Sequence, residues 1–296
     1  MSQRYSTDVR FSKQFGVLET ISFWGEGVGV GLYIAATAAG QSVLAALGIV
    51  FVCAAVIALL AHLGKPQRSW RAVRKFGHAF VSRGTLAIGL FLVFAAVAFV
   101  AGHISFLEPF GHLLTVAALI CSLPVIIYAG MLLRSMRAIR LWRSIFLPLS
   151  FAAHSLATGL ISVWALAAVG ASRIAWLTSG ALVTLLLCAA LSAAYILRAE
   201  RSVGVRASLD RLFSGDLRVS FLLGAGLFGF AVPVAVLVVS EFTFAGYTPL
   251  LAVFAALCRL YGDFAYRNAI VRAGAYEPIV PSAPSELFKK ARAATK

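Results

Sequence analysis

The chain has 296 residues, of which 61% are hydrophobic and only 12% are charged, and its formal net charge is +15. Soluble domains are about half apolar and about a quarter charged, so this composition excludes an ordinary soluble globular protein. Nucleic-acid binding is disfavoured as well, because the basic residues lie between apolar runs rather than in a basic domain of their own.

Long apolar runs follow one another along the chain, and each approaches the roughly 20 residues that a helix needs to cross a bilayer. A membrane β-barrel would instead alternate apolar and polar residues in segments of about 10. The sequence therefore predicts an all-α integral membrane protein with eight transmembrane helices, arranged as two adjacent four-helix bundles. The predicted spans are residues 17–38, 42–63, 84–103, 110–133, 145–169, 174–197, 219–240 and 246–266.

Basic residues are concentrated in alternate connections between these spans. Of the 26 Lys and Arg, 24 lie in residues 1–16, 64–83, 134–144, 198–218 and 267–296. An even number of spans places all five segments on one side, and the positive-inside rule predicts that this side is cytoplasmic. We therefore expect a multi-pass protein of the inner (cytoplasmic) membrane with both termini in the cytoplasm. Its parts would be an N-terminal segment (1–16), a membrane domain (17–266) and a C-terminal tail (267–296).

Ionisable residues within the predicted spans are functional candidates, because charge is costly in hydrocarbon. In chain order they are Glu19, Glu26, His154, Arg259 and Asp263, with His62 and Arg83 at helix ends. Arg259 and Asp263 are four residues apart on one helix, so we expect them to form an ion pair. Glu26 stands among alternating glycines, which allow a helix or a flat ligand to approach closely, and its carboxyl needs a partner or a proton.

Cysteine and histidine give little sign of a resident metal. The four cysteines show no C-x-x-C spacing and are expected to be packing residues. Two histidines, His62 and His154, could share one half of the membrane and clamp a haem, which keeps a haem b cytochrome subunit as a lesser alternative. We predict no metal site in the chain itself.

Several short runs resemble the membrane-anchor subunits of dimethyl sulfoxide reductase-type and polysulfide reductase-type molybdenum enzymes. They are HLGKP at residues 62–66, SWRA at 69–72, FVSR at 80–83 and, near the end, RLYGDFAYRN at 259–268. The family pattern has a His-Leu-Gly-Arg-Pro turn and a Ser-Arg-Glu helix start. This chain departs from it at Gly84, where the pattern has the glutamate.

The resemblance implies a membrane anchor and quinone-reactive subunit of a multi-subunit molybdenum or tungsten oxidoreductase. Such a subunit passes electrons between the quinone pool and an iron–sulfur subunit. Its cofactor would be a quinone or quinol (menaquinone or ubiquinone). The iron–sulfur clusters and molybdopterin would belong to two partners, an iron–sulfur electron-transfer subunit and a bis-molybdopterin catalytic subunit.

The resemblance also implies a quinone site at the end of the second span. His62 would exchange protons near neutral pH, and Arg71 or Arg83 would stabilise negative charge on the quinone oxygen. Gly84 supplies no carboxylate, and this departure has two interpretations. Glu26 or Glu19 on the first helix, or Asp263 on the eighth, replaces the carboxylate, or the quinone site has moved or been lost and the chain is a pure anchor. The full candidate set is His62, Gly64, Arg71, Ser82, Arg83, Glu26, Glu19 and Asp263.

The basic connection 64–83 has two interpretations. Membrane topology and attraction to anionic headgroups explain its charge without any partner. Alternatively, it docks an acidic soluble subunit through electrostatic complementarity. The docking candidates are Lys65, Arg68, Arg74 and Lys75.

A secondary transporter is the competing class of function. Eight helices with buried carboxylates are common in transporters, and Pro124 and Pro233 could mark broken helices. The sequence offers no ion site near the middle of the membrane, which argues against this class. A transporter would work alone, whereas an anchor depends on soluble subunits.

Overall fold

The computed structural model describes residues 9–12, 15–62, 80–170, 174–200, 202–240 and 248–277. Helices make up most of this part of the chain. They are α1 (Val17–Ala38), α2 (Ser42–His62), α4 (Phe80–Ala101), α5 (Gly111–Ser135), α6 (Phe146–Val169), α7 (Ala175–Leu197), α8 (Val203–Phe213), the π-helix η4 (Ser220–Ala231), α9 (Val232–Ser240) and α10 (Thr248–Ala273). The described part also contains two 3-10 turns, η2 (Glu108–Phe110) and η3 (Arg140–Arg143). Two short strands, β1 (Arg10–Phe11) and β2 (Ala275–Tyr276), pair in antiparallel orientation.

Seven helices in the described part are long and apolar enough to cross a membrane, so the chain is a multi-pass membrane protein. They are residues 42–61, 80–101, 108–135, 146–169, 175–197, 220–240 and 249–273. The helix α1 has 22 residues but is not among the seven, because its two glutamates and several glycines and hydroxyl residues lower its hydropathy. The count of eight crossings and the two-bundle arrangement stay predictions.

Two spans begin or end four or more residues away from the prediction, and a third is divided into two helices. The helix α4 begins at Phe80, so Ser82 and Arg83 belong to its first turn rather than to a loop. The span over 219–240 is divided into the π-helix η4 and α9. The last helix, α10, continues to Ala273, two turns beyond the predicted end, because Arg267 is buried inside the protein instead of starting a polar tail.

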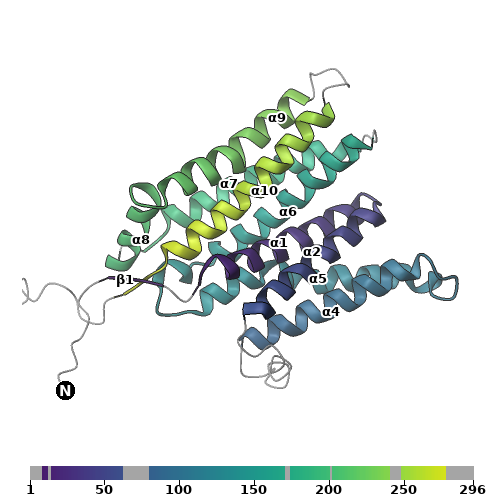
Figure 1. Ribbon diagram of the computed structural model, residues 1–296, viewed down its shortest axis with the longest axis horizontal. Coiled ribbons are helices and arrows are strands. Elements are labelled where there is room, and N and C mark those ends of the chain that lie inside the picture. The colour runs from purple at the N-terminus through teal and green to yellow at the C-terminus, as the bar shows by residue number, and fades with distance from the viewer. Residues whose placement is uncertain are drawn as a thin grey trace, which may run out of the picture.

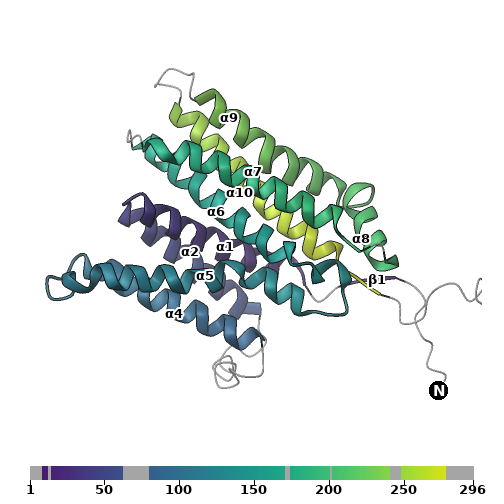
Figure 2. The same cartoon turned by 180° about the vertical axis from the view of Figure 1, so that it is seen from behind.

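The helices lie roughly side by side in two groups that follow chain order (Figure 1). The first group contains α1, α2, α4 and α5, and the second contains α6, α7, α9 and α10; the reverse view shows the same grouping (Figure 2). Helices α1 and α6 pack against each other where the groups meet, and α10 contacts both of them. The joint between the groups is therefore built from α1, α6 and α10.

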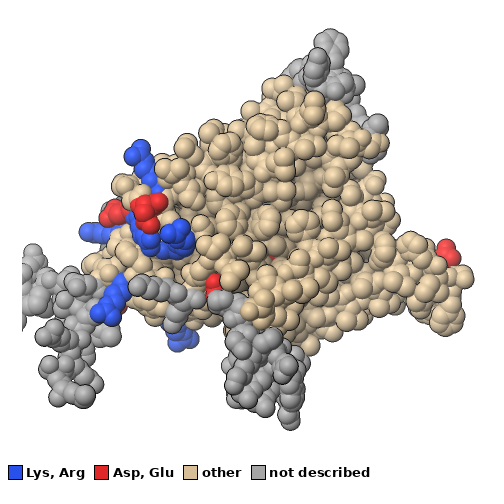
Figure 3. Space-filling view, in the orientation of Figure 1, with Lys and Arg blue, Asp and Glu red and all other residues tan. Residues whose placement is uncertain are grey.

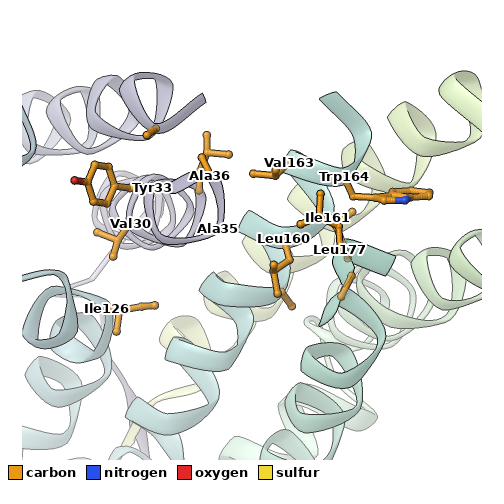
Figure 4. Packing of buried hydrophobic residues seen from close by; sticks show 14 of the residues in the cluster. Val30, Tyr33, Ala35, Ala36, Ile126, Leu160, Ile161, Val163, Trp164 and Leu177 are labelled. Carbon is orange, nitrogen blue, oxygen red and sulfur yellow. The ribbon is translucent and has the colours of Figure 1, made fainter. Parts of the chain in front are cut away.

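Apolar side chains fill this joint. Figure 4 shows Val30 and Tyr33 of α1 near Ile126 of α5, with Leu160 and Val163 of α6 on the other side of α1. Large apolar side chains are also exposed on the outer surfaces of the spans, as expected where lipid replaces water.

Glycines set how closely α1 approaches α6. The Cα of Gly159 lies against the backbone of Gly31, and the Cα of Gly31 lies against the backbone carbonyl of Ser155, so a methyl group on either glycine would overlap main-chain atoms of the other helix. Small residues permit this close contact between membrane helices, where dispersion replaces the hydrophobic effect as the main attraction. A different glycine, Gly40, has a positive φ of 68° and turns the chain from α1 into α2.

Basic side chains gather at one end of the molecule, where α8 and the strand pair lie (Figure 3). At this end Arg211 donates to both carboxylate oxygens of Asp216 at 2.6 Å. These hydrogen bonds hold the pKa of Asp216 below its ordinary value. Because the pKa is lowered in the folded state, the pair stabilises the protein above the ordinary aspartate range and loses that effect as pH falls through the folded pKa.

Replacing Gly159 by Ala should lower the thermal unfolding midpoint in detergent, because the added methyl overlaps the backbone of Gly31. Overpacking of this kind typically costs about 1–3 kcal/mol. The matched control is Gly89→Ala on α4, where an added methyl meets no described atom within 4 Å. That variant should be as stable as the unaltered protein or slightly more stable. Equal midpoints for the two variants would contradict the α1–α6 contact.

Candidate functional site

Arg267 is the centre of a buried polar network. Its side chain is only 1% exposed, and its Nε donates to Asp263 Oδ1 at 3.0 Å on the same helix. Its Nη1 donates to the carbonyl of Phe23 on α1 at 3.3 Å. Its Nη2 donates to the carbonyl of Phe151 and to Ser155 Oγ on α6, at 3.1 and 2.8 Å. One guanidinium thus ties together α10, α1 and α6.

His154 extends this network from Asp263 toward α7. Its Nδ1 lies 3.4 Å from Asp263 Oδ1, and its Nε2 lies 3.2 Å from Ser192 Oγ. The imidazole stacks on the ring of Tyr266 with centroids 4.1 Å apart. Both His154 and Asp263 are 0% exposed, and His154 Nδ1 and Asp263 Oδ2 make no hydrogen bond to any described atom. The network therefore retains unused hydrogen-bonding capacity in its centre.

The predicted ion pair between Arg259 and Asp263 is wrong. Asp263 pairs with Arg267, the basic residue one turn further along α10. The guanidinium of Arg259 instead donates to Thr158 Oγ1 at 3.1 Å and to the carbonyl of Gly229 in η4 at 2.6 Å. Spacing along a helix allowed either pairing, and the carbonyls of the neighbouring helices decided between them.

Glu26 of α1 lies beside this network, and no hydrogen bond joins it to the described residues of the network. Its side chain is only 6% exposed, and its Oε1 has no hydrogen-bond partner within the described residues. Arg267 and Tyr128 of α5 are its electrostatic neighbours. The guanidinium of Arg267 packs closely against the backbone of α1 next to Glu26, because a Cβ on the adjacent Gly27 would lie 2.7 Å from Arg267 Nη2.

Glu19 has a structural role at the start of α1. Its Oε2 accepts a hydrogen bond from the Gly16 amide at 2.7 Å, which is the one half of a capping box that a glycine N-cap permits. It is seven residues before Glu26, which corresponds to about 10 Å along the helix. Among the two α1 carboxyls, Glu26 is therefore the one that lies at the buried network.

The start of α4 explains why Gly84 stands where the anchor pattern has a glutamate. The aromatic ring of Tyr128 lies directly against Gly84, so any side chain at position 84 would overlap it. Tyr128 also stacks on Phe80, with the centroids 6.0 Å apart and the planes nearly parallel. Ser82 is buried in the same turn, while Arg83 is exposed and has an interaction partner. Sequence analysis missed Tyr128, because one tyrosine in an apolar run gives no signal of its contacts.

Several predicted residues cannot be placed. The side chain of His62, at the end of α2, is not described. The other members of this group lie outside the described residues, and their roles stay predictions: Gly64, Lys65, Arg68, Arg71, Arg74 and Lys75. Within the described ranges, no cluster of three or more His, Cys, Asp or Glu could hold a metal ion.

Comparison with protein families identifies a match for most of the chain. A family model described as DMSO reductase anchor subunit (DmsC) matches residues 18–209, which contain α1 to α7 and the first part of α8. This match confirms the resemblance to anchor subunits of DMSO reductase-type complexes. No curated protein matches the chain. The matched range includes Glu26 and His154, whereas Asp263 and Arg267 lie beyond it.

Replacing Asp263 by Asn should strongly destabilise the protein, because Arg267 would keep a buried charge without its counter-ion. Breaking a buried pair in this way typically costs about 3–5 kcal/mol. The matched control is Asp216→Asn, which breaks an Asp–Arg pair whose carboxylate is 50% exposed. Exposed pairs contribute about 0–1 kcal/mol. Denaturant titration of both variants in mixed micelles measures their free energies of unfolding. A similar decrease in the two variants would argue against a stabilising role for the buried pair of Arg267 and Asp263.

Proposed function

This chain belongs to the DMSO reductase anchor subunit family, and from that premise we propose that it carries electrons between the membrane quinone pool and an iron–sulfur subunit. Membership makes it a membrane anchor subunit of a DMSO reductase-type complex. The proposal adds quinone reactivity, an iron–sulfur partner and a molybdenum or tungsten catalytic subunit. The observation that carries it is the family match over residues 18–209, which spans the HLGKP turn and the start of α4.

A quinone site needs hydrogen-bond donors for the carbonyl oxygens and a group that exchanges protons. In this proposal His62 and Arg83 supply donors at the adjoining ends of α2 and α4. Glu26 supplies the carboxyl that Gly84 cannot, since its Oε1 is buried without a described hydrogen-bond partner. A bound quinol would supply two electrons and two protons. The residues of this chain would orient its ring and accept a proton at the carboxyl oxygen.

The basic end of the molecule supports the proposed orientation in the membrane. The described residues next to both termini, Arg10 and Tyr276, pair in the strands β1 and β2 at that end. Basic charge on one side is typical of the cytoplasmic face. We therefore place both termini in the cytoplasm, with the iron–sulfur subunit docked at the same face. The residues Lys65, Arg68, Arg74 and Lys75 would contribute to that docking.

Affinity purification of the tagged chain from its native membranes tests the assembly. We expect stoichiometric iron–sulfur and molybdenum or tungsten subunits in mild detergent, with the metals quantified by elemental analysis. Both partners should be released together when the basic connection 64–83 is neutralised. A lone polypeptide that moves solutes in vesicles would instead support the transporter class and contradict the anchor.

Replacing Glu26 by Gln in the intact complex should reduce quinol-linked turnover by about 10²-fold or more, the usual contribution of a positioned acid–base group. A separate Glu19→Gln variant tests whether the other carboxyl of α1 contributes to quinol-linked turnover. The matched control is Glu108→Gln, an exposed glutamate in η2 between α4 and α5. Turnover should be measured with a soluble quinol and with an artificial donor that bypasses the membrane. Unchanged quinol rates in both α1 variants would remove these carboxyls from the quinone site.

A further inference from the structure

The carboxyl of Glu26 has a positive charge near it, but its Oε1 accepts no hydrogen bond from any described residue. A guanidinium carries five N–H donors. Within the described residues, the four hydrogen bonds of Arg267 go to Asp263, Phe23, Phe151 and Ser155, and none goes to Glu26. Arg267 therefore acts on Glu26 through space, as a nearby positive charge, without fixing either carboxyl oxygen.

The groups around Glu26 are few and can be named helix by helix. From α10 comes Arg267, whose ion-pair partner Asp263 in turn contacts His154 of α6. From α5 comes the phenol of Tyr128. The described part of α2 presents the Phe51 carbonyl and the methyl group of Ala55, which lie against Gly25. Charge near Glu26 is therefore set by the pair on α10.

The protonation state of Glu26 changes the net charge of the buried side chains near the α1–α10 contact. Two arginines, Arg259 and Arg267, are buried on α10 together with one aspartate, Asp263. With Glu26 ionised, these four side chains sum to zero; with Glu26 protonated, they sum to +1. Low polarity favours the neutral carboxyl, whereas the guanidinium favours the carboxylate, so each protonation state has its own stabilising interaction.

We propose that Glu26 is a reversible proton-binding site within the membrane domain. Binding converts the carboxylate to the carboxylic acid at an oxygen that no described donor occupies, and no electron is transferred. The ring of Tyr128 packs against Gly84, and its phenol is the neighbouring polar group on α5 that interacts electrostatically with Glu26. The inference goes beyond quinone binding and does not depend on it, because the site would take up a proton in the isolated chain.

Infrared spectroscopy of the full chain in lipid nanodiscs, free of quinone and partner subunits, tests the proposal. We expect the carbonyl band of a protonated carboxylic acid to grow as pH falls and to shift when glutamate alone is labelled with ¹³C. The band should disappear in Glu26→Gln, persist in Glu108→Gln and move in Tyr128→Phe. Labelling assigns the band to glutamate in the unaltered protein, so the test holds even if one variant fails to accumulate.

Two results would overturn the inference. A chain with no titrating glutamate band would mean that Glu26 remains ionised beside Arg267. A Glu26 band of constant amplitude over the whole pH range of the folded protein would mean that it remains protonated. Quinol-linked turnover is measured separately in the assembled complex, so loss of the titrating band and loss of quinol activity are distinguishable outcomes.

Discussion

The ion pair between Arg267 and Asp263 is the interaction on which the described interior depends. A guanidinium in a dry environment must find an acceptor for nearly every N–H, and α10 alone offers only one carboxylate for it. The remaining acceptors are carbonyls and a hydroxyl on α1 and α6. Burying this charge therefore requires three helices at short range, and the positions of α1, α6 and α10 follow from that requirement.

Small residues make the required distances available. The contact between Gly31 and Gly159 brings the backbones of α1 and α6 together near the turn where Ser155 meets Arg267. Gly229 and Gly262 likewise bring η4 close to α10, and the carbonyl of Gly229 then accepts the bond from Arg259. Glycine packing and charge burial thus support each other, since neither arginine could reach its acceptors across helices spaced by large side chains.

The same geometry gives this anchor subunit an unusual distribution of acid groups. The start of α4 has no room for a carboxylate, because Tyr128 covers Gly84. A buried carboxyl is found instead on α1, at Glu26, within the electrostatic reach of Tyr128 and Arg267. The proposed quinone chemistry and the proposed proton site both use this rearrangement. In the quinone proposal, the carboxyl on α1 takes the place of the one that the anchor pattern has on the helix after the HLGKP turn.

Hydropathy and spacing alone determined the helical membrane class, the bounds of α1, the clustering of basic residues and the identity of the buried ionisable residues Glu26, His154, Arg259 and Asp263. They could do so because the cost of charge in hydrocarbon depends on residue type and on position along the chain. Tertiary structure alone decided which arginine pairs with Asp263, that Arg267 is buried rather than part of a tail, and that Tyr128 fills the space beside Gly84. These outcomes depend on which carbonyls and rings the neighbouring helices bring within hydrogen-bonding or van der Waals distance, and a spacing of four residues fits either arginine equally well.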